Sequence, residues 1–164
     1  MRKFEKISFE EFQEATGLTK EDYENYSIPK RGTKYSAGYD FELLESFDLK
    51  PGETKIVPTG IKAMMNDDEV LFLIIRSSLG FKYNIKVSNQ VGVIDKDYYD
   101  TKDTEGHIFV KLQNDGSELK HFEKHEHFVQ GIFMKYLTTD DENEISSERT
   151  GGLGSTNQGE ENDW

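Results

Sequence analysis

Alternating apolar and polar residues dominate the middle of the chain. Apolar residues occupy positions 41 and 43, and then 47 and 49, with polar residues beside them. The segment 70–75 (Val-Leu-Phe-Leu-Ile-Ile) is apolar throughout, as expected of a strand buried on both faces. Further strand cores are expected at 56–57, 61–63, 85–87, 91–94, 108–112 and 128–137. Short strands separated by frequent turns predict an all-β sandwich, jelly roll or barrel.

The first 28 residues have a different pattern, which predicts two short helices. Ser8 and Glu11 have the spacing of a capping box, and Thr19 and Asp22 repeat it before Pro29. A helix-turn-helix motif is disfavoured, because residues 1–26 contain four basic and seven acidic side chains. We therefore expect a helical extension packed on the main domain.

The chain changes again after residue 139. From Asp140 to the end, eight acidic residues stand against the single Arg149, and the stretch 149–156 has little to bury. Such a segment is expected to be flexible until a ligand orders it. The predicted organisation is a helical extension at 1–28, a β domain at 29–139 and a C-terminal arm at 140–164.

Length and charge narrow the possible functions. The 164 residues suit one domain, and 20 basic against 32 acidic side chains give a net charge of −12. Acidic surfaces repel nucleic-acid phosphates and anionic membranes, so neither is an expected partner. The chain has no cysteine, no signal peptide pattern and no apolar run of the roughly 18 residues needed to span a membrane. We expect a cytoplasmic protein.

Three segments carry candidate chemistry. Arg76, Ser77 and Ser78 follow the apolar strand, and an Arg fork with two hydroxyls can hold phosphate oxygens; a surface turn is the simpler interpretation. Asp95 follows an apolar run and can act as a base, unless it is only a solvated turn residue. The glycines and hydroxyls of 149–156 can wrap phosphates through backbone N–H groups, or form a plain linker.

Taken together and in order, five segments resemble the five motifs of the trimeric dUTPases, the deoxyuridine triphosphate nucleotidohydrolases. They are 37–40 (Ala-Gly-Tyr-Asp), 76–80 (Arg-Ser-Ser-Leu-Gly), 92–98 (Gly-Val-Ile-Asp-Lys-Asp-Tyr), 129–130 (Val-Gln) and 149–156 (Arg-Thr-Gly-Gly-Leu-Gly-Ser-Thr). The resemblance covers about residues 29–156. The segment 105–109 resembles dUTPases of Gram-positive bacteria and their phages.

The resemblance implies a dUTPase-like jelly-roll or β-clip domain that forms a homotrimer. Each of its three active sites would combine a uridine pocket, phosphate-binding motifs and a C-terminal arm from different subunits. The implied reaction hydrolyses dUTP to dUMP and pyrophosphate, with Mg²⁺ arriving on the phosphates.

The resemblance also assigns roles to individual residues. Asp95 would hold and deprotonate the attacking water, and Asp40 would bind the metal indirectly through water. Phosphate oxygens would be held by Arg76, Ser77, Ser78 and Gln130. The uracil and deoxyribose would lie against Asn89, Gly92, Val93, Ile94, Tyr98, Ile108 and Phe109. The arm would close on the substrate with Arg149, Gly152, Leu153, Gly154, Ser155 and Thr156.

Four positions depart from the family pattern. Leu153 stands where many relatives have a Phe that stacks on uracil, and His127 stands where an Arg is usual. Asp100 and Asn157 replace glycines. None of these changes touches the expected base, so the resemblance still implies an active enzyme.

Three alternatives stay open beside the hydrolase. A dCTP deaminase has a related fold, but it needs a catalytic Glu where this chain has Lys111, and a cation cannot act as that base near neutral pH. A regulatory module would bind a protein partner through the N-terminal helices. A non-catalytic jelly-roll domain would lose no function on Asp95→Asn.

A zinc site at His121, His125 and His127 is disfavoured, although the last two would share a strand face.

Overall fold

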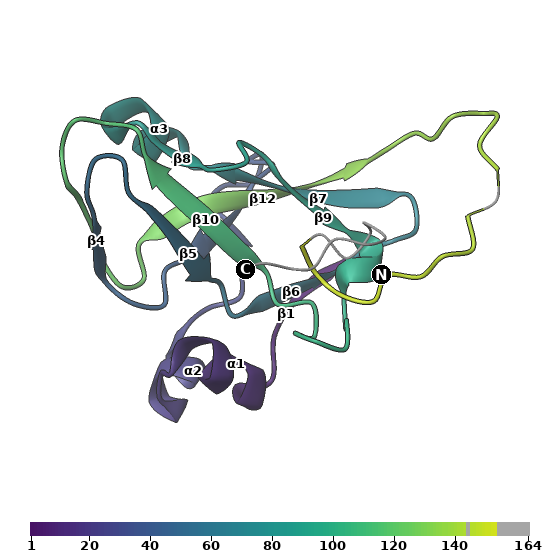
Figure 1. Cartoon of the computed structure of the whole chain (residues 1–164), viewed down its shortest axis with the longest axis horizontal. Helices are drawn as coiled ribbons and strands as arrows, with labels where there is room; N and C mark the ends of the chain where they lie inside the picture. The colour runs from purple at the N-terminus through teal and green to yellow at the C-terminus, as the bar shows by residue number, and fades with distance from the viewer. Residues whose placement is uncertain (144, 154–164) are drawn as a thin grey trace.

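Two antiparallel sheets form the body of the protein in a computed structural model, which describes residues 1–143 and 145–153 (Figure 1). The larger sheet has the strand order β2 (Lys30–Arg31), β3 (Tyr39–Glu42), β12 (His127–Lys135), β7 (Glu69–Ile75) and β9 (Gly92–Asp95). The smaller sheet has the order β5 (Thr54–Pro58), β10 (Phe109–Asn114) and β8 (Ile85–Val87). Two pairs complete the fold, β1 (Lys3–Lys6) with β6 (Ile61–Met64) and β11 (Lys120–Phe122) with β4 (Phe47–Leu49). The predicted all-β, jelly-roll-like fold is confirmed.

The expectation that the strand at 70–75 is buried on both faces is wrong for the single chain. Leu71 and Leu73 are fully buried, whereas Phe72 and Ile74 are only half-buried. The strand lies between β12 and β9, so its backbone is paired along both edges while one face remains partly open. Half-buried apolar residues on a central strand are suited to contact with another chain.

The N-terminal segment contains the two predicted helices, α1 (Phe9–Thr16) and α2 (Lys20–Asn25). The Ser8 side chain accepts from the Glu11 N–H, and Thr19 and Asp22 form a complete capping box. The strand β1 ahead of them was not predicted from the sequence; Phe4 pairs with Ala63 in β6. Because β1 starts this segment, the extension is a strand followed by helices rather than helices alone.

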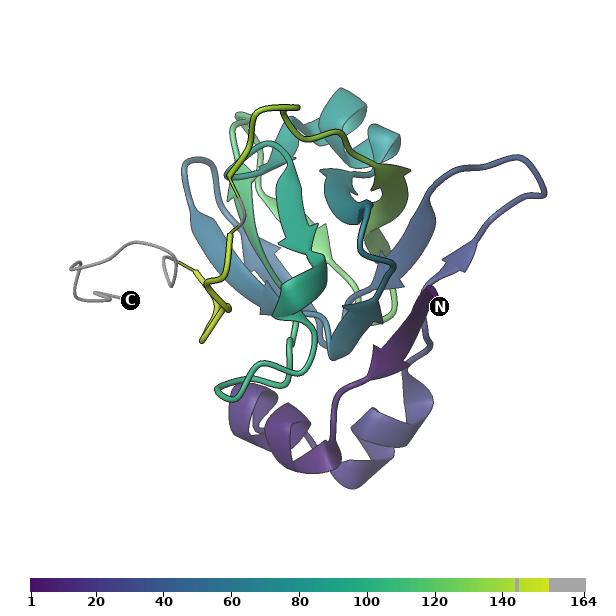
Figure 2. The same ribbon diagram turned by 90° about the vertical axis from the view of Figure 1, so that its right-hand side faces the viewer.

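The N-terminal segment shares the core of the β domain. Phe4, Ile7, Phe12 and Tyr26 are buried in the same apolar cluster as the strands. Its aromatic rings contact one another; the rings of Phe12 and Tyr26 are stacked with centroids 5.5 Å apart. In Figure 2 the two purple helices lie against one end of the sheets, beside the loop that follows β9.

A third helix, α3 (Ser77–Tyr83), lies where the sequence predicted a strand end followed by a turn. It begins directly after β7, buries Leu79 and ends at Asn84, whose φ is +52°. Its seven residues are too few for the sequence to show a helical spacing of apolar positions. The helix therefore carries the two predicted phosphate-binding serines on its first turn.

Between residues 136 and 153 the described chain forms no strand or helix. This part of the C-terminal arm leaves β12 and returns beside the short 3-10 helix η1 (Lys96–Tyr98) (Figure 1). Among the described residues, no helix is both long and apolar enough to cross a membrane.

Candidate nucleotide-binding site

The end of β9 and the start of β10 form an apolar pocket. Its inner part, about 240 Å³, is lined by Leu73, Val87, Ser88, Asn89, Gly92, Val93, Ile94, Phe109, Val110, Lys111 and Leu153. Its outer part, about 210 Å³, shares some of these residues and adds Asp95, Tyr98, Arg149 and Gly152. The structure thus brings together nearly all residues predicted to contact the base and sugar. Ile108 was also predicted to contact the nucleoside, but it is fully buried and does not line the pocket.

Tyr98 is held rigidly at the edge of this pocket. Its hydroxyl donates to the backbone carbonyl of His107 at 2.5 Å. Burial raises the pKa of Tyr98, so the phenol keeps its proton for this hydrogen bond at neutral pH. The hydroxyl is therefore engaged with the protein, and the face of the ring is left to line the pocket.

Asp95 lies at the mouth of the pocket, where its side chain is half exposed. The Arg149 guanidinium contacts two carboxylates there: its Nη2 lies 2.7 Å from Asp95 Oδ2, and its Nε lies 2.8 Å from Asp97 Oδ1. The Gly152 N–H donates to Asp103 at 3.2 Å. In this single chain, the start of the arm therefore lies over the chain's own candidate base.

The remaining arm residues predicted to bind substrate, Gly154, Ser155 and Thr156, lie outside the described residues. Leu153 is placed, with 71% of its surface exposed, and it lines both parts of the pocket. A branched aliphatic side chain can cover a flat ring by dispersion without a stacking geometry.

A second cluster forms where β3, β7 and β12 meet. Arg76 Nε lies 3.1 Å from Asp40 Oδ1, and His127 Nδ1 lies 3.8 Å from Asp40 Oδ2. Gln130 pairs with Asp40 across β12 and β3. A Cβ on Gly38 would lie 2.1 Å from the Gln130 side-chain oxygen, so only glycine leaves room for this amide. The cluster combines a guanidinium, an amide and the nearby hydroxyls of α3, which are ordinary ligands for phosphate.

The two clusters lie at opposite ends of β7. Asp95 pairs with Val70 near its start, whereas Arg76 follows its last residue, Ile75. At about 3.3 Å per residue, six residues of strand separate the two positions by about 20 Å. A single chain therefore does not bring Asp95 and Arg76 to one phosphate group.

His125 and His127 do not share a strand face, contrary to the prediction. His125 lies in the turn before β12 with φ +68°, and its Nδ1 is 3.3 Å from Glu42. His127 begins β12 and faces Asp40 instead. His125 precedes the strand and has a left-handed backbone, so the alternation of strand faces does not relate the two side chains.

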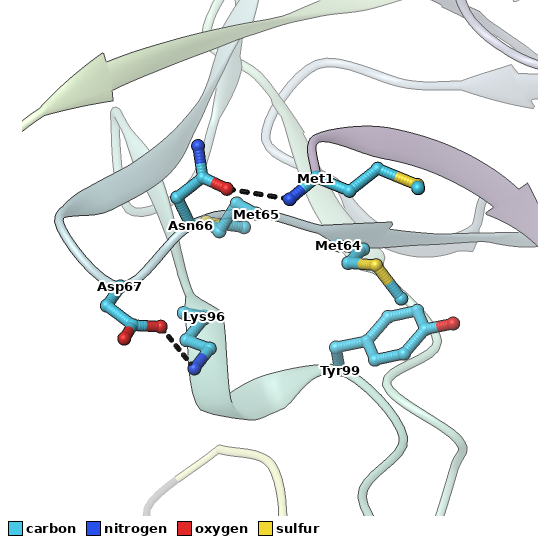
Figure 3. Close-up of a pocket in the computed structure, with 7 residues that line it drawn as sticks. All are labelled: Met1, Met64, Met65, Asn66, Asp67, Lys96 and Tyr99. Carbon is cyan, nitrogen blue, oxygen red and sulfur yellow. Dashed lines mark hydrogen bonds and ion pairs between the residues drawn. The ribbon is translucent and has the colours of Figure 1, made fainter.

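A wider, open hollow of about 520 Å³ lies between the start of the chain, the turn after β6 and the ends of η1 (Figure 3). Met1, Met64, Met65 and Tyr99 supply its apolar lining. Its polar groups bind one another: Lys96 contacts Asp67 at 2.6 Å, and the terminal amine donates to Asn66 at 2.8 Å. The hollow therefore lacks the converging polar groups that fix a ligand in a specific site.

Three contacts at the site were not predicted from the sequence. Asp97 and Asp103 bind the arm, and Glu11 reaches the buried His107 behind Tyr98. Acidic residues are abundant throughout this chain, so nothing in the pattern distinguished these from solvated surface residues.

The fold and the two clusters describe a β protein suited to nucleotides, with an apolar pocket for a base and a separate Arg and hydroxyl cluster for phosphates. The family model for dUTPase matches residues 24–159. The deoxyuridine 5'-triphosphate nucleotidohydrolase of Lactococcus lactis is 49% identical over 140 residues, covering 85% of this chain and 93% of that protein. The corresponding Haemophilus influenzae protein is 37% identical over 112 residues, covering 66% and 70%. The chain belongs to the dUTPase family.

Solved structures agree with this assignment. The crystal structure of dUTPase from Streptococcus mutans is 40% identical, with a TM-score of 0.68, and covers 84% of this chain and 98% of its own. The dUTPase from phage phi11 of S. aureus is 17% identical, with a TM-score of 0.66 over 90% of this chain and 97% of its own. The second likeness speaks for the fold alone.

Proposed function

We propose that this chain is a cytoplasmic dUTP diphosphatase, which hydrolyses dUTP to dUMP and pyrophosphate. The observation that carries the proposal is the position of Asp95 at the mouth of an apolar pocket, in a chain that belongs to the dUTPase family. An exposed carboxylate beside a base-sized pocket can reach a water near the first phosphate of a bound nucleotide.

The pocket selects the substrate through its backbone and Tyr98. Val93, Ile94, Phe109 and Asn89 line the pocket, and the backbone of β9 and β10 there would offer donors and acceptors to the uracil edge. Cytosine exchanges a donor for an acceptor at this edge, so it would leave buried polar groups unpaired. The Tyr98 ring packs against the deoxyribose and excludes a 2′-hydroxyl.

Asp95 takes the proton of the attacking water in the proposed step. The water oxygen forms a bond to the α-phosphorus, the bond from that phosphorus to the bridging oxygen breaks, and pyrophosphate leaves with the electron pair. For Asp95 to act as the base, the Arg149 of its own chain must leave the carboxylate, while the arm that encloses the phosphates would come from another chain. The polyanion favours this rearrangement, since a guanidinium binds phosphate at least as well as carboxylate.

The second cluster supplies positive charge and donors for the phosphates. Arg76, Ser77, Ser78 and Gln130 would hold the phosphate oxygens in line with the water, which lowers the barrier by positioning and by electrostatic stabilisation. The arm residues Arg149, Gly154, Ser155 and Thr156 would enclose the outer phosphates.

The donor set of the chain fits a magnesium ion held mainly by the substrate. Within the described residues, no group of three or more His, Asp or Glu side chains is arranged to hold a metal. Asp40 Oδ1 lies 3.1 Å from Arg76 Nε, and Asp40 Oδ2, which lies 3.8 Å from His127 Nδ1, would accept from a water of the metal. Bound to the triphosphate, Mg²⁺ neutralises charge on the phosphate oxygens.

The separation of the two clusters supports a homotrimer with shared sites. Asp95 and Arg76 lie at opposite ends of β7, so a complete site needs Asp95 from one chain and Arg76 from another. The half-buried Phe72 and Ile74 on the same strand offer an apolar surface for that association.

Pyrophosphate release from dUTP, dCTP, dTTP and UTP, each with Mg²⁺ and with EDTA, tests the proposal. We expect turnover of dUTP alone, abolished by EDTA. Asp95→Asn should lower turnover by at least about a thousandfold while nucleotide binding persists. Asp67→Asn, on an exposed residue outside the site, is the matched control and should keep wild-type turnover. Release from none of the four nucleotides would contradict the proposal.

A further inference from the structure

Helix α1 contacts the loop between η1 and β10 through its N-cap residue, Ser8, and through Glu11. Ser8, which caps α1, donates to the Glu105 carboxylate from its N–H at 3.0 Å and from its hydroxyl at 2.5 Å. Glu11 Oε1 lies 3.1 Å from Nδ1 of His107. The N-terminal helices in Figure 2 are therefore fastened to the segment that connects η1 with β10.

The hydrogen bonds of His107 fix the protonation of its ring. The ring is fully buried, and its Nε2 accepts the N–H of Gly60 at 2.9 Å. Nε2 therefore carries no proton, so the neutral ring must carry it on Nδ1, which donates to Glu11. Burial lowers the pKa of His107 to about 4, which keeps the ring neutral at physiological pH.

His107 supports two side chains that line the pocket. Its carbonyl oxygen accepts the Tyr98 hydroxyl at 2.5 Å. Its ring lies against Phe109, with centroids 4.2 Å apart and planes at 41°. Rotation of the imidazole would therefore disturb Phe109 directly, whereas a displacement of His107 as a whole would also move the backbone carbonyl that holds Tyr98.

We propose that Glu11 is a positioning residue for the nucleoside pocket, acting through His107 on Tyr98 and Phe109. The proposal rests on the function proposed above. Glu11 lies before the region that the family model matches, residues 24–159, so the family pattern assigns it no role. The N-terminal segment is thereby part of what sets affinity for the deoxynucleoside, although it contributes no residue to the pocket wall.

The hydrogen bond between Glu11 and His107 is protected from solvent. The Glu11 side chain is 11% exposed, so its hydrogen bond to His107 is largely shielded from water. Gly60, whose N–H binds the other ring nitrogen, is itself held in place, since its carbonyl oxygen accepts the Ile7 N–H at 3.1 Å and the Tyr26 hydroxyl at 2.8 Å. Removing Glu11 would leave the buried Nδ1–H without its acceptor, and the ring would then be held only through Nε2, which favours a shift of His107.

Steady-state kinetics on Glu11→Ala and Glu11→Gln test the inference, with Glu10→Ala as the matched control. Glu10 lies on the same helix and is exposed. We expect Glu11→Ala to raise KM for dUTP about tenfold with kcat within about twofold, and to lower the preference for dUTP over UTP about tenfold. Glu11→Gln should restore most of the affinity, because its amide oxygen also accepts from Nδ1. Glu10→Ala should behave as wild type.

The split between KM and kcat separates positioning from general destabilisation, which would lower the active fraction and hence the apparent kcat. If Glu11→Ala does not fold, Glu11→Asp replaces it; withdrawing the carboxylate by one methylene should raise KM about threefold. A folded Glu11→Ala or Glu11→Asp protein with wild-type KM and dUTP preference would overturn the inference. Wild-type protein without dUTP turnover would instead overturn the proposed function, and this inference with it.

Discussion

At the scale of single residues, the burial of His107 beside the pocket makes the free energy of unfolding depend on pH. The imidazole is fully buried and neutral, and burial lowers its pKa from 6.5 to about 4. The unfolded chain binds a proton at His107 below pH 6.5, whereas the folded chain binds it only near pH 4. The free energy of unfolding therefore rises with pH across this window.

We predict that this residue lowers stability by up to about 3 kcal/mol as the pH falls from 6.5 to 4. Urea unfolding at several pH values measures the effect. His107→Gln should have a shallower dependence than the wild type in this window. Equal slopes in the two proteins would show that His107 is not buried in its neutral form.

Single residues at the site were predictable where they belong to a local motif. Asp95, Arg76 and Tyr98 each lie in a contiguous segment that resembles a family motif. The contacts that were missed join residues distant in the chain: Glu11 and His107 are 96 positions apart, and Arg149 and Asp97 are 52 apart. Such pairs form only in the tertiary fold, so a local sequence pattern does not predict them.

At the scale of elements, the junction between the N-terminal segment and β6 depends on Gly60. This residue has φ +71°, and a Cβ there would lie 2.8 Å from the Tyr26 ring. Gly17, at the end of α1, has nearly the same φ of +70°, but a Cβ there would have no other atom within 4 Å. The two glycines therefore separate backbone strain from steric overlap.

We predict that Gly17→Ala costs about 1 kcal/mol of stability, from the left-handed backbone alone. Gly60→Ala should cost at least about 2 kcal/mol more, because the Tyr26 ring must also move from its place in the core. Chemical denaturation of both variants measures the difference. Equal losses would mean that Tyr26 adjusts freely and that the junction is not tightly packed.

The positions of most strands and of the two N-terminal helices followed from apolar spacing and capping residues, while β1, β2, β11 and α3 did not. The segment 3–6 (Lys-Phe-Glu-Lys) has only one apolar residue, so its pairing with β6 is set by the tertiary neighbour. The segment 77–83 is too short to show a helical period, and its N-cap, Arg76, makes no side-chain cap hydrogen bond that could have marked the start of the helix.

At the scale of the whole molecule, the position of the two clusters supports the proposal that a complete site needs more than one chain. The pocket with Asp95 and the cluster with Arg76 are held at opposite ends of a rigid seven-residue strand, so no local motion of the described residues joins them. In the proposed trimer, rotation about the symmetry axis brings the cluster of one chain to the pocket of its neighbour.

Complementation between two inactive variants tests this central claim most directly. Asp95→Asn and Arg76→Ala chains, each inactive alone, are mixed in equal amounts, unfolded and refolded together, and assayed for dUTP hydrolysis. If Asp95 and Arg76 act from different chains, about a quarter of the sites in randomly mixed trimers carry both intact residues, and activity returns to about that fraction of wild type. If both act from one chain, every site keeps a defect, and the mixture stays as inactive as either variant treated alone, which would contradict the account.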